Sequence, residues 1–217
     1  MQGAYADPRG FESFFHSYWK SWLGRLPEGV RSGLPSTDKF HVAVEPLAVS
    51  AKGGREAERQ AGAEVRRRLG LSEAPGRAGG GFSLSHSLSG SHGTGLCIGV
   101  RWNGACVGVD LEPSSRPVTD AIRMRIAAET MLAPWGAGLS GIQIWCLKEA
   151  AFKSCPWNEG TTLAHFWIEG WDADSRIARI GFPPHPGGLK SGSAWGTVAE
   201  TQGVEAAFAI GIVGVRS

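Results

Sequence analysis

Two acidic residues alternate with apolar ones in Val109-Asp110-Leu111-Glu112, a run typical of a β-strand. Because side chains alternate across a strand, Asp110 and Glu112 are predicted to share one face. Neighbouring carboxylates repel each other unless a cation lies between them. Mg²⁺ takes oxygen ligands of this kind while keeping waters and substrate phosphates in its other positions. We therefore expect either a Mg²⁺ site here or, as the simpler alternative, two solvated acids at a strand end.

A second candidate group lies in Ser140–Lys153, which has the pattern of a helix capped by Ser140. Glu149 and Lys153 are four residues apart and share a helical face. Taken alone, this pair is interpreted as an ordinary surface salt bridge, worth about 0.2–0.5 kcal/mol.

A third candidate is the hydroxyl-rich segment Ser83-Leu84-Ser85-His86-Ser87, which we expect to form a turn. A histidine between hydroxyl groups can contact an anionic ligand, but His86 taken alone is interpreted as a polar residue with partners inside a loop. These three segments need a scaffold that brings them together.

The composition excludes several classes of protein. The chain has 217 residues, a formal net charge of +2 and 42% hydrophobic residues, which suits one compact domain or two small lobes. The pI of 8.4 lies below the value of about 9 expected of a nucleic-acid-binding domain, so no nucleic-acid partner is expected. Arginine nevertheless outnumbers lysine, 16 to 6, and guanidinium groups suit phosphate, so a local anion site remains possible.

No membrane association is expected, because no apolar run is long enough to span a bilayer. Asp7, Arg9 and Glu12 interrupt the apolar core that a signal peptide requires, so the predicted compartment is the cytoplasm. The four cysteines lack the spacing of a zinc site or a disulfide framework and are expected to be buried or half-buried thiols. Neither a Walker A loop nor a G-x-S-x-G motif is present.

The pattern of apolar residues and breakers predicts helices and strands in both halves of the chain. Helices are expected at 11–23, 55–69, 120–132 and 140–153. Strands are expected at 40–49, 96–102, 105–112, 163–171, 176–182 and 203–215. A Gly/Pro-rich linker is expected at 74–81, and the chain breaks at 113–117, where we place a boundary between two lobes.

Asn103-Gly104 between two strand-like runs is the strongest short signal for a hairpin. In that hairpin, paired residue numbers sum to 207, so Cys97 is predicted to face Asp110 and Cys106 to face Arg101. This register excludes a Cys97–Cys106 disulfide across the hairpin.

The order Ser-His-Ser, then Gly-Val-Asp-Leu-Glu, then Trp-x-x-Lys-Glu-x-x-x-x-Lys resembles the phosphopantetheinyl transferase superfamily. The length is similar to that of the monomeric two-lobe type that activates peptide, siderophore and polyketide synthetases. The resemblance covers residues 55–153. It implies an α+β fold of two similar α/β lobes, 1–112 and 113–217, packed in pseudo-twofold fashion with the active site between them.

The resemblance also implies roles for individual residues. Asp110, Glu112 and Glu149 match the Mg²⁺ ligands, and Lys153 matches a lysine near the pyrophosphate of coenzyme A. Further matches to coenzyme A contacts are Ser85, His86, Arg55 and Lys148. The segment Arg55-x-x-Glu58-x-x-x-Gly62 resembles the family's helix motif, but Ala63 stands where the family usually has arginine. Candidates to replace that arginine are Arg59, Arg66 and Arg77. The catalytic base is either Glu149 or Glu129.

The implied reaction transfers the 4′-phosphopantetheine arm of coenzyme A to a serine of an apo acyl, aryl or peptidyl carrier protein, with Mg²⁺ as cofactor. One alternative is a degenerate member that binds coenzyme A without transferring its arm, and another is a different Mg²⁺-dependent phosphotransferase. A monomer is expected. The aromatic segments 11–22 and 157–171 are candidates for carrier docking, although a place in the core is the simpler expectation for most of their side chains.

Overall fold

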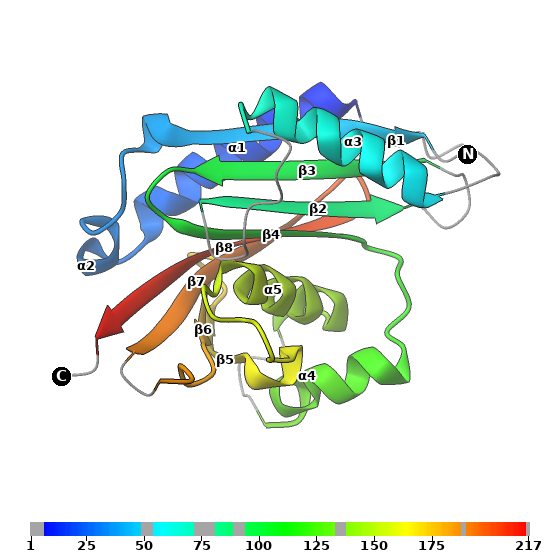
Figure 1. Cartoon of the computed structure of the whole chain (residues 1–217). Helices are drawn as coiled ribbons and strands as arrows, with labels where there is room; N and C mark the ends of the chain where they lie inside the picture. Colours follow the sequence, from blue (N-terminus) through cyan, green and yellow to red (C-terminus); the bar gives the residue numbers. More distant parts are fainter. Residues whose placement is uncertain are drawn as a thin grey trace.

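The computed structural model describes residues 7–48, 54–71, 81–88, 94–132, 138–187 and 190–215. It has a mixed α+β architecture with two β-sheets, as expected from the sequence (Figure 1). The predicted linker at 74–81 lies, except for Gly81, outside the described residues. Within the described residues, no helix is both long and apolar enough to cross a membrane.

The first sheet has three strands in the order β1 (Phe40–Ala48), β3 (Thr94–Trp102) and β2 (Phe82–Leu88), all antiparallel to their neighbours. Helix α3 (Gly54–Arg68) covers one face through Val65, which packs in a cluster with Leu47 and Cys97. Helix α1 (Pro8–Arg25) covers the other face and begins at Asp7, whose carboxylate accepts the N–H groups of its first turn. Strand β1 lies at an edge of this sheet, a position that suits Pro46, which has no N–H to donate.

The second sheet has five antiparallel strands. Their order is β4 (Cys106–Pro113), β8 (Val204–Val215), β7 (Lys190–Thr201), β6 (Ile177–Gly181) and β5 (Trp167–Asp172). One face packs against α5 (Gly141–Ser154) and α4 (Asp120–Leu132). Three short helical segments complete the described elements: α2 (Glu28–Arg31), η1 (Thr37–Lys39) and η3 (Leu163–His165).

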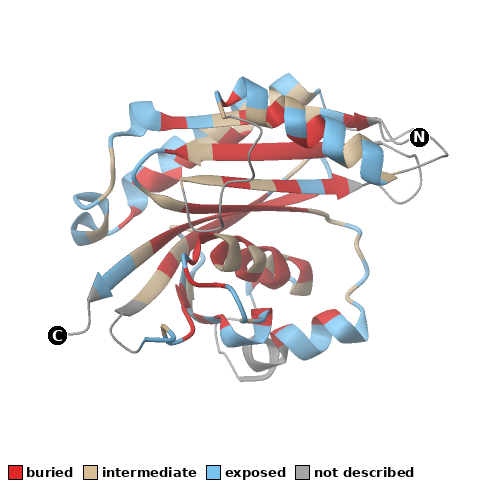
Figure 2. Ribbon diagram, viewed as in Figure 1, coloured by how far each residue is buried: buried red, intermediate tan, exposed pale blue. Residues whose placement is uncertain are grey.

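Helix α1 joins the two sheets through its aromatic face. Trp19 is 1% exposed, and its ring centroid lies 4.5 Å from that of Phe40 on β1 and 3.8 Å from that of Phe208 on β8. The same core cluster contains Ile98 of β3 and Val109 of β4. The aromatic stripe at 11–22 is therefore mainly core, and Figure 2 shows buried residues concentrated on β3 and α5.

The four predicted helices are confirmed to within a few residues. Ser140 caps α5 with a complete capping box, because its hydroxyl accepts from Gln143 N–H and the Gln143 side chain accepts from Ser140 N–H. The strand predicted at 163–171 is partly wrong, since η3 occupies its first residues and β5 starts at Trp167. Strand β7 was not predicted.

The predicted hairpin at Asn103-Gly104 is wrong. The chain does reverse there, with Gly104 at φ +89°, but β3 already pairs with β1 on one edge and β2 on the other. Cys97 therefore pairs with Glu45 and His86, whereas Asp110 pairs with Ala207 on β8. None of the four cysteines, all of which are described, forms a disulfide, so the prediction of no Cys97–Cys106 bridge holds, although the register behind it is wrong.

The turn predicted at Ser83–Ser87 is also wrong, because these residues form strand β2. The segment alternates strictly: Ser83, Ser85 and Ser87 are buried, and His86 between them is exposed. Period-two alternation of this kind is typical of a strand, and the hydroxyl content concealed it.

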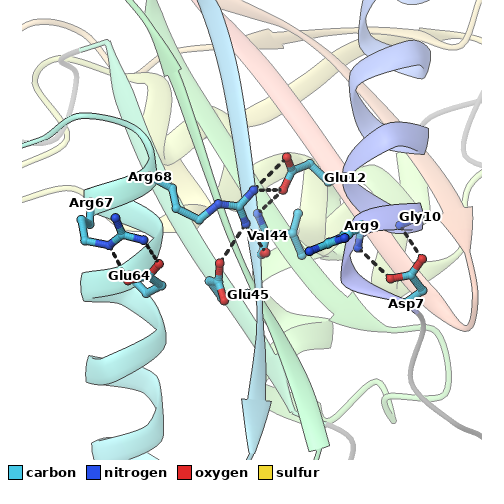
Figure 3. A network of polar contacts seen from close by, with 9 residues as sticks. All are labelled: Asp7, Arg9, Gly10, Glu12, Val44, Glu45, Glu64, Arg67 and Arg68. Carbon is cyan, nitrogen blue, oxygen red and sulfur yellow. Dashed lines mark hydrogen bonds and ion pairs between the residues drawn. The ribbon is translucent and has the colours of Figure 1, made fainter.

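An arginine ties α1, β1 and α3 together at the outer surface (Figure 3). The Arg68 guanidinium donates to both carboxylate oxygens of Glu12, to Glu45 Oε1 at 2.8 Å and to the Val44 carbonyl at 2.8 Å. Val44 N–H donates in turn to Glu12 Oε2 at 3.0 Å. These carboxylates raise the pKa of Arg68 despite its partial burial. We call this set the Arg68 network.

Candidate functional site

Asp110 lies in the middle of β4 and is 4% exposed. Its Oδ1 accepts from the Lys153 ammonium at 2.7 Å and from the Ser85 hydroxyl at 2.9 Å. Its Oδ2 is buried and has no hydrogen-bond partner within the described part of the chain. A buried carboxylate oxygen without a partner is costly, so this atom is suited to a further cation or donor.

Lys153, near the end of α5, points away from its own helix toward β4. Its Nζ donates to Asp110 Oδ1, to the Val109 carbonyl at 3.1 Å and to Ser85 Oγ at 3.3 Å. An ammonium has three hydrogens, so these acceptors occupy all of them. Burial opposes the charge, but the Asp110 carboxylate outweighs it and the pKa of Lys153 is raised. We call Lys153, Asp110, Ser85 and Val109 the Lys153 network.

The predicted salt bridge between Glu149 and Lys153 is wrong. Both residues are described, and no ion pair joins them, because Lys153 bonds to Asp110 instead. Burial raises the pKa of Glu149 to about 6, and repulsion from Asp110 adds to this effect more than attraction by Lys153 reduces it. The charged form of Glu149 is therefore disfavoured mainly by its burial.

Glu112, two residues after Asp110, is paired with Arg116, which the sequence analysis did not name, and with Trp145, the tryptophan of the Trp-x-x-Lys-Glu motif. The Arg116 guanidinium forms an ion pair with Glu112 Oε1, and Trp145 Nε1 donates to the same oxygen at 3.0 Å. The Arg116 guanidinium also lies 5.6 Å from the Trp145 ring centroid. Burial and repulsion from Asp110 raise the pKa of Glu112 despite these partners. The sequence signal for Arg116 is its position four residues after Glu112.

A pocket of about 500 Å³ opens beside Glu112. His86 on β2 lines it, and His86 Nε2 lies 3.5 Å from Glu58 Oε1 on α3. Glu58, Glu112 and Arg116 also line it. The remaining lining residues are Ser87, Pro113, Ser115 and Pro117. The Ser83–Ser87 segment and the acidic strand therefore both contribute to this pocket, whereas Asp110, Glu149 and Lys153 are not among the described residues that line it.

Strands β2 and β4 meet along a seam made by serine hydroxyls. Val109 N–H donates to Ser83 Oγ at 3.0 Å, and Leu111 N–H donates to Ser85 Oγ at 3.2 Å. Both bonds join residues 26 positions apart, so the two strands run in the same direction across this seam. The Ser85 hydroxyl is thus engaged inside the fold.

Helix α5 lies unusually close to β4. A Cβ at Gly108 would lie 1.8 Å from the Ala150 carbonyl oxygen, and one at Gly211 on β8 would lie 2.5 Å from the Ser154 carbonyl oxygen. Distances this short allow only glycine at both positions. The close contact places Glu149 and Lys153 against the strand that carries Asp110.

The other predicted contacts lie elsewhere. Lys148 is 2% exposed, and its ammonium donates to the Arg125 carbonyl on α4 at 2.7 Å, away from the pocket lining. Arg55 is exposed on α3. Arg77 lies outside the described residues, and Glu129 lies on α4 with its side chain outside the description.

Two observations bear on whether Mg²⁺ fits Asp110, Glu112 and Glu149. Asp110, Glu112 and Glu149 would supply oxygen ligands, and the Asp110 Oδ2 has no partner within the described residues. Burial raises the pKa of both glutamates and repulsion from Asp110 adds to this effect, so a bound cation would favour their charged forms. However, within the ranges that the structure covers, no three His, Cys, Asp or Glu side chains already form a group that could hold a metal ion. The donor chemistry therefore fits Mg²⁺, while a preformed cage is absent from the described residues.

Comparisons with known proteins add no assignment to this geometry. No family model matches the sequence, and no curated protein matches it. A function must therefore be inferred from the side chains that the fold brings together and from the motifs that they form.

Proposed function

We propose that this protein transfers the 4′-phosphopantetheine arm of coenzyme A to a serine hydroxyl of an apo carrier protein, releasing adenosine 3′,5′-bisphosphate. The observation that carries the proposal is the convergence of three separate motifs. Lys153 bonds to Asp110, the Asp110 and Glu112 carboxylates both act electrostatically on Glu149, and Glu112 lines a pocket of about 500 Å³ together with His86. Phosphoryl transfer depends on positioning and charge neutralisation more than on covalent catalysis, and this set of residues supplies both.

Each side chain has a distinct task in the proposed reaction. Asp110, Glu112 and Glu149 would hold Mg²⁺, which when bound neutralises charge on the pyrophosphate. Arg116 and His86, which line the pocket, bind phosphate oxygens. Lys153 holds the Asp110 carboxylate in place and adds positive charge beside the cluster. Glu149, with its pKa near 6, or Glu129 accepts the proton of the attacking serine.

A two-lobe, pseudo-twofold arrangement with the site between the lobes is part of the proposal. It is supported by the pocket lining, which takes Glu58 and His86 from the proposed 1–112 lobe and Arg116 from the 113–217 lobe. That division stays a prediction, since β4 belongs to the proposed first lobe yet pairs with β8 in the five-stranded sheet. The carrier as partner, a monomeric state and a cytoplasmic location also belong to the proposal.

The direct test incubates the chain with coenzyme A, Mg²⁺ and a panel of apo acyl, aryl and peptidyl carrier proteins. Mass spectrometry of the carrier should reveal the added phosphopantetheine arm for at least one of them. A matched reaction with the carrier's acceptor serine replaced by alanine controls for non-specific modification. Absence of the arm from every carrier would contradict the proposal.

A degenerate protein that binds coenzyme A without transfer is the second candidate. It is favoured by the hydrogen bonds that the Lys153 ammonium and the Ser85 hydroxyl donate inside the fold, because these donors are then already occupied and not available to a ligand. Calorimetric titration with coenzyme A separates the candidates, because binding without modification of any carrier supports the second one.

A further inference from the structure

Strand β2 carries a row of three buried serines, Ser83, Ser85 and Ser87, and the first two each accept a hydrogen bond from a backbone N–H of β4. Ser83 Oγ accepts from Val109 N–H, and Ser85 Oγ accepts from Leu111 N–H. Side chains two residues apart on β2 thus meet N–H groups two residues apart on β4. Continuing this register, Ser87 faces position 113.

Position 113 is a proline, which has no N–H to donate. The third bond of the row is therefore not made. Ser87 is 3% exposed, and its Oγ is buried without a hydrogen-bond partner within the described residues. A buried hydroxyl with no partner lowers stability, so an apolar residue would suit the fold better at this position.

Ser87 differs from Ser83 and Ser85 in a second respect, because it lines the pocket beside Glu112. The neighbouring lining includes Arg116 and His86, which are both suited to anionic oxygens. A hydroxyl beside such groups can donate to a phosphate oxygen, as polar side chains in binding sites commonly do.

We propose that the Ser87 hydroxyl donates a hydrogen bond to a phosphoryl oxygen of the ligand in this pocket. The inference deepens the proposed function and rests on it only for the identity of the ligand as coenzyme A. Ser85, which the motif resemblance assigns to the phosphates, instead positions Asp110 through its own hydroxyl. The phosphate contact thus belongs to the serine two residues further along β2.

The test compares Ser87→Ala with Ser83→Ala, a matched buried serine of the same strand and row. Titration calorimetry with coenzyme A, and separately with inorganic pyrophosphate, measures ligand affinity. Urea unfolding measures stability. Ser87→Ala is expected to weaken coenzyme A binding about tenfold while leaving stability unchanged or slightly raised. Ser83→Ala is expected to show the reverse, since it leaves Val109 N–H buried without an acceptor while ligand affinity is kept.

A double-mutant comparison tests the register itself. Pro113→Ala restores an N–H at position 113, so Ser87→Ala in that background should lower stability, as Ser83→Ala does in the wild-type chain. Stability that is insensitive to Ser87 in both backgrounds would show that Ser87 does not face position 113, and the inference would be overturned.

The inference and the proposed function fail in distinguishable ways. Equal affinity of wild type and Ser87→Ala for both probes, or a loss of stability in Ser87→Ala matching that of Ser83→Ala, overturns the role of Ser87. Weakened coenzyme A binding by Ser87→Ala without transfer to any carrier upholds Ser87 and rejects the transferase. A wild-type chain that binds neither probe overturns both.

Discussion

The Arg68 network at the outer surface and the Lys153 network at the seam between the sheets are built from similar parts. Each joins a long cationic side chain to carboxylate and carbonyl oxygens. Around Arg68, both oxygens of Glu12 have partners, and β1 contributes an N–H as well. Around Lys153, one oxygen of Asp110 has two donors, while the other is buried and has none among the residues that the structure describes. The first network is complete as a structural tie, whereas the second leaves an acceptor for something outside the fold.

Removing the charge of Asp110 is expected to give the largest effect. Asp110→Asn should reduce transfer by at least about a hundredfold, because the proposed Mg²⁺ site loses a charged ligand and the negative charge on the pyrophosphate is then less well neutralised. It should also lower the unfolding free energy by about 1–3 kcal/mol, since Lys153 loses a charged acceptor. Urea unfolding of the variant measures this loss of stability. Normal transfer by the variant would reject the assignment of Asp110.

Arg68→Met tests the other network with a side chain of similar length and no charge. We expect the unfolding free energy to fall by about 1–2 kcal/mol, a modest value because these side chains are partly solvated. Transfer per folded molecule should be unchanged. A large loss of transfer in Arg68→Met, measured below its unfolding temperature, would show that the distinction between the two networks is wrong.

The dependence of stability on pH should give the smallest effect. The pKa of Glu149 is about 6 in the folded chain, above the ordinary value of 4.5, so the folded state binds this proton more tightly than the unfolded state. In metal-free buffer, the Glu149 contribution should therefore raise stability as the pH falls through 6 toward 4.5. Glu149→Gln should flatten part of this dependence, with the remainder due to Glu112, whose pKa is also raised. Urea unfolding at about pH 7.5 and about pH 5 measures the change, and an identical profile for the variant would contradict it.

Local signals predicted the helices because each one is determined by nearby residues. The apolar face of α1 and the capping box of Ser140 and Gln143 are both readable within a few positions of the chain. The acidic pair on β4 was predicted for the same reason, since strand alternation places Asp110 and Glu112 on one side. Ser83–Ser87 alternates equally clearly, but its many hydroxyl groups are also typical of a turn, and this second signal gave the wrong prediction.

Non-local contacts were beyond the sequence patterns. The Asn103-Gly104 signal is genuine for a chain reversal, but β2 occupies the strand edge that a hairpin would need. Lys153 was paired with its helical neighbour because the alternative partner, Asp110, is 43 positions away. Arg116 could not be placed on Glu112 without knowing the path of the chain after β4. For the hairpin and for Lys153, the competing partner comes from a distant segment, whereas Arg116 is only four residues from Glu112.

Gly108 determines how such a site could change over evolutionary time. Its missing side chain lets the Ala150 carbonyl approach to a distance that any Cβ would forbid, so the backbones of α5 and β4 are in direct contact. The separation between Glu149 on α5 and Asp110 and Glu112 on β4 is then determined by contact between the two backbones and not by side chains. Substitution at position 108 cannot adjust that gap in small steps, because alanine is already the smallest possible change. Variation at this site is therefore expected in the acidic side chains, while position 108 is expected to remain glycine.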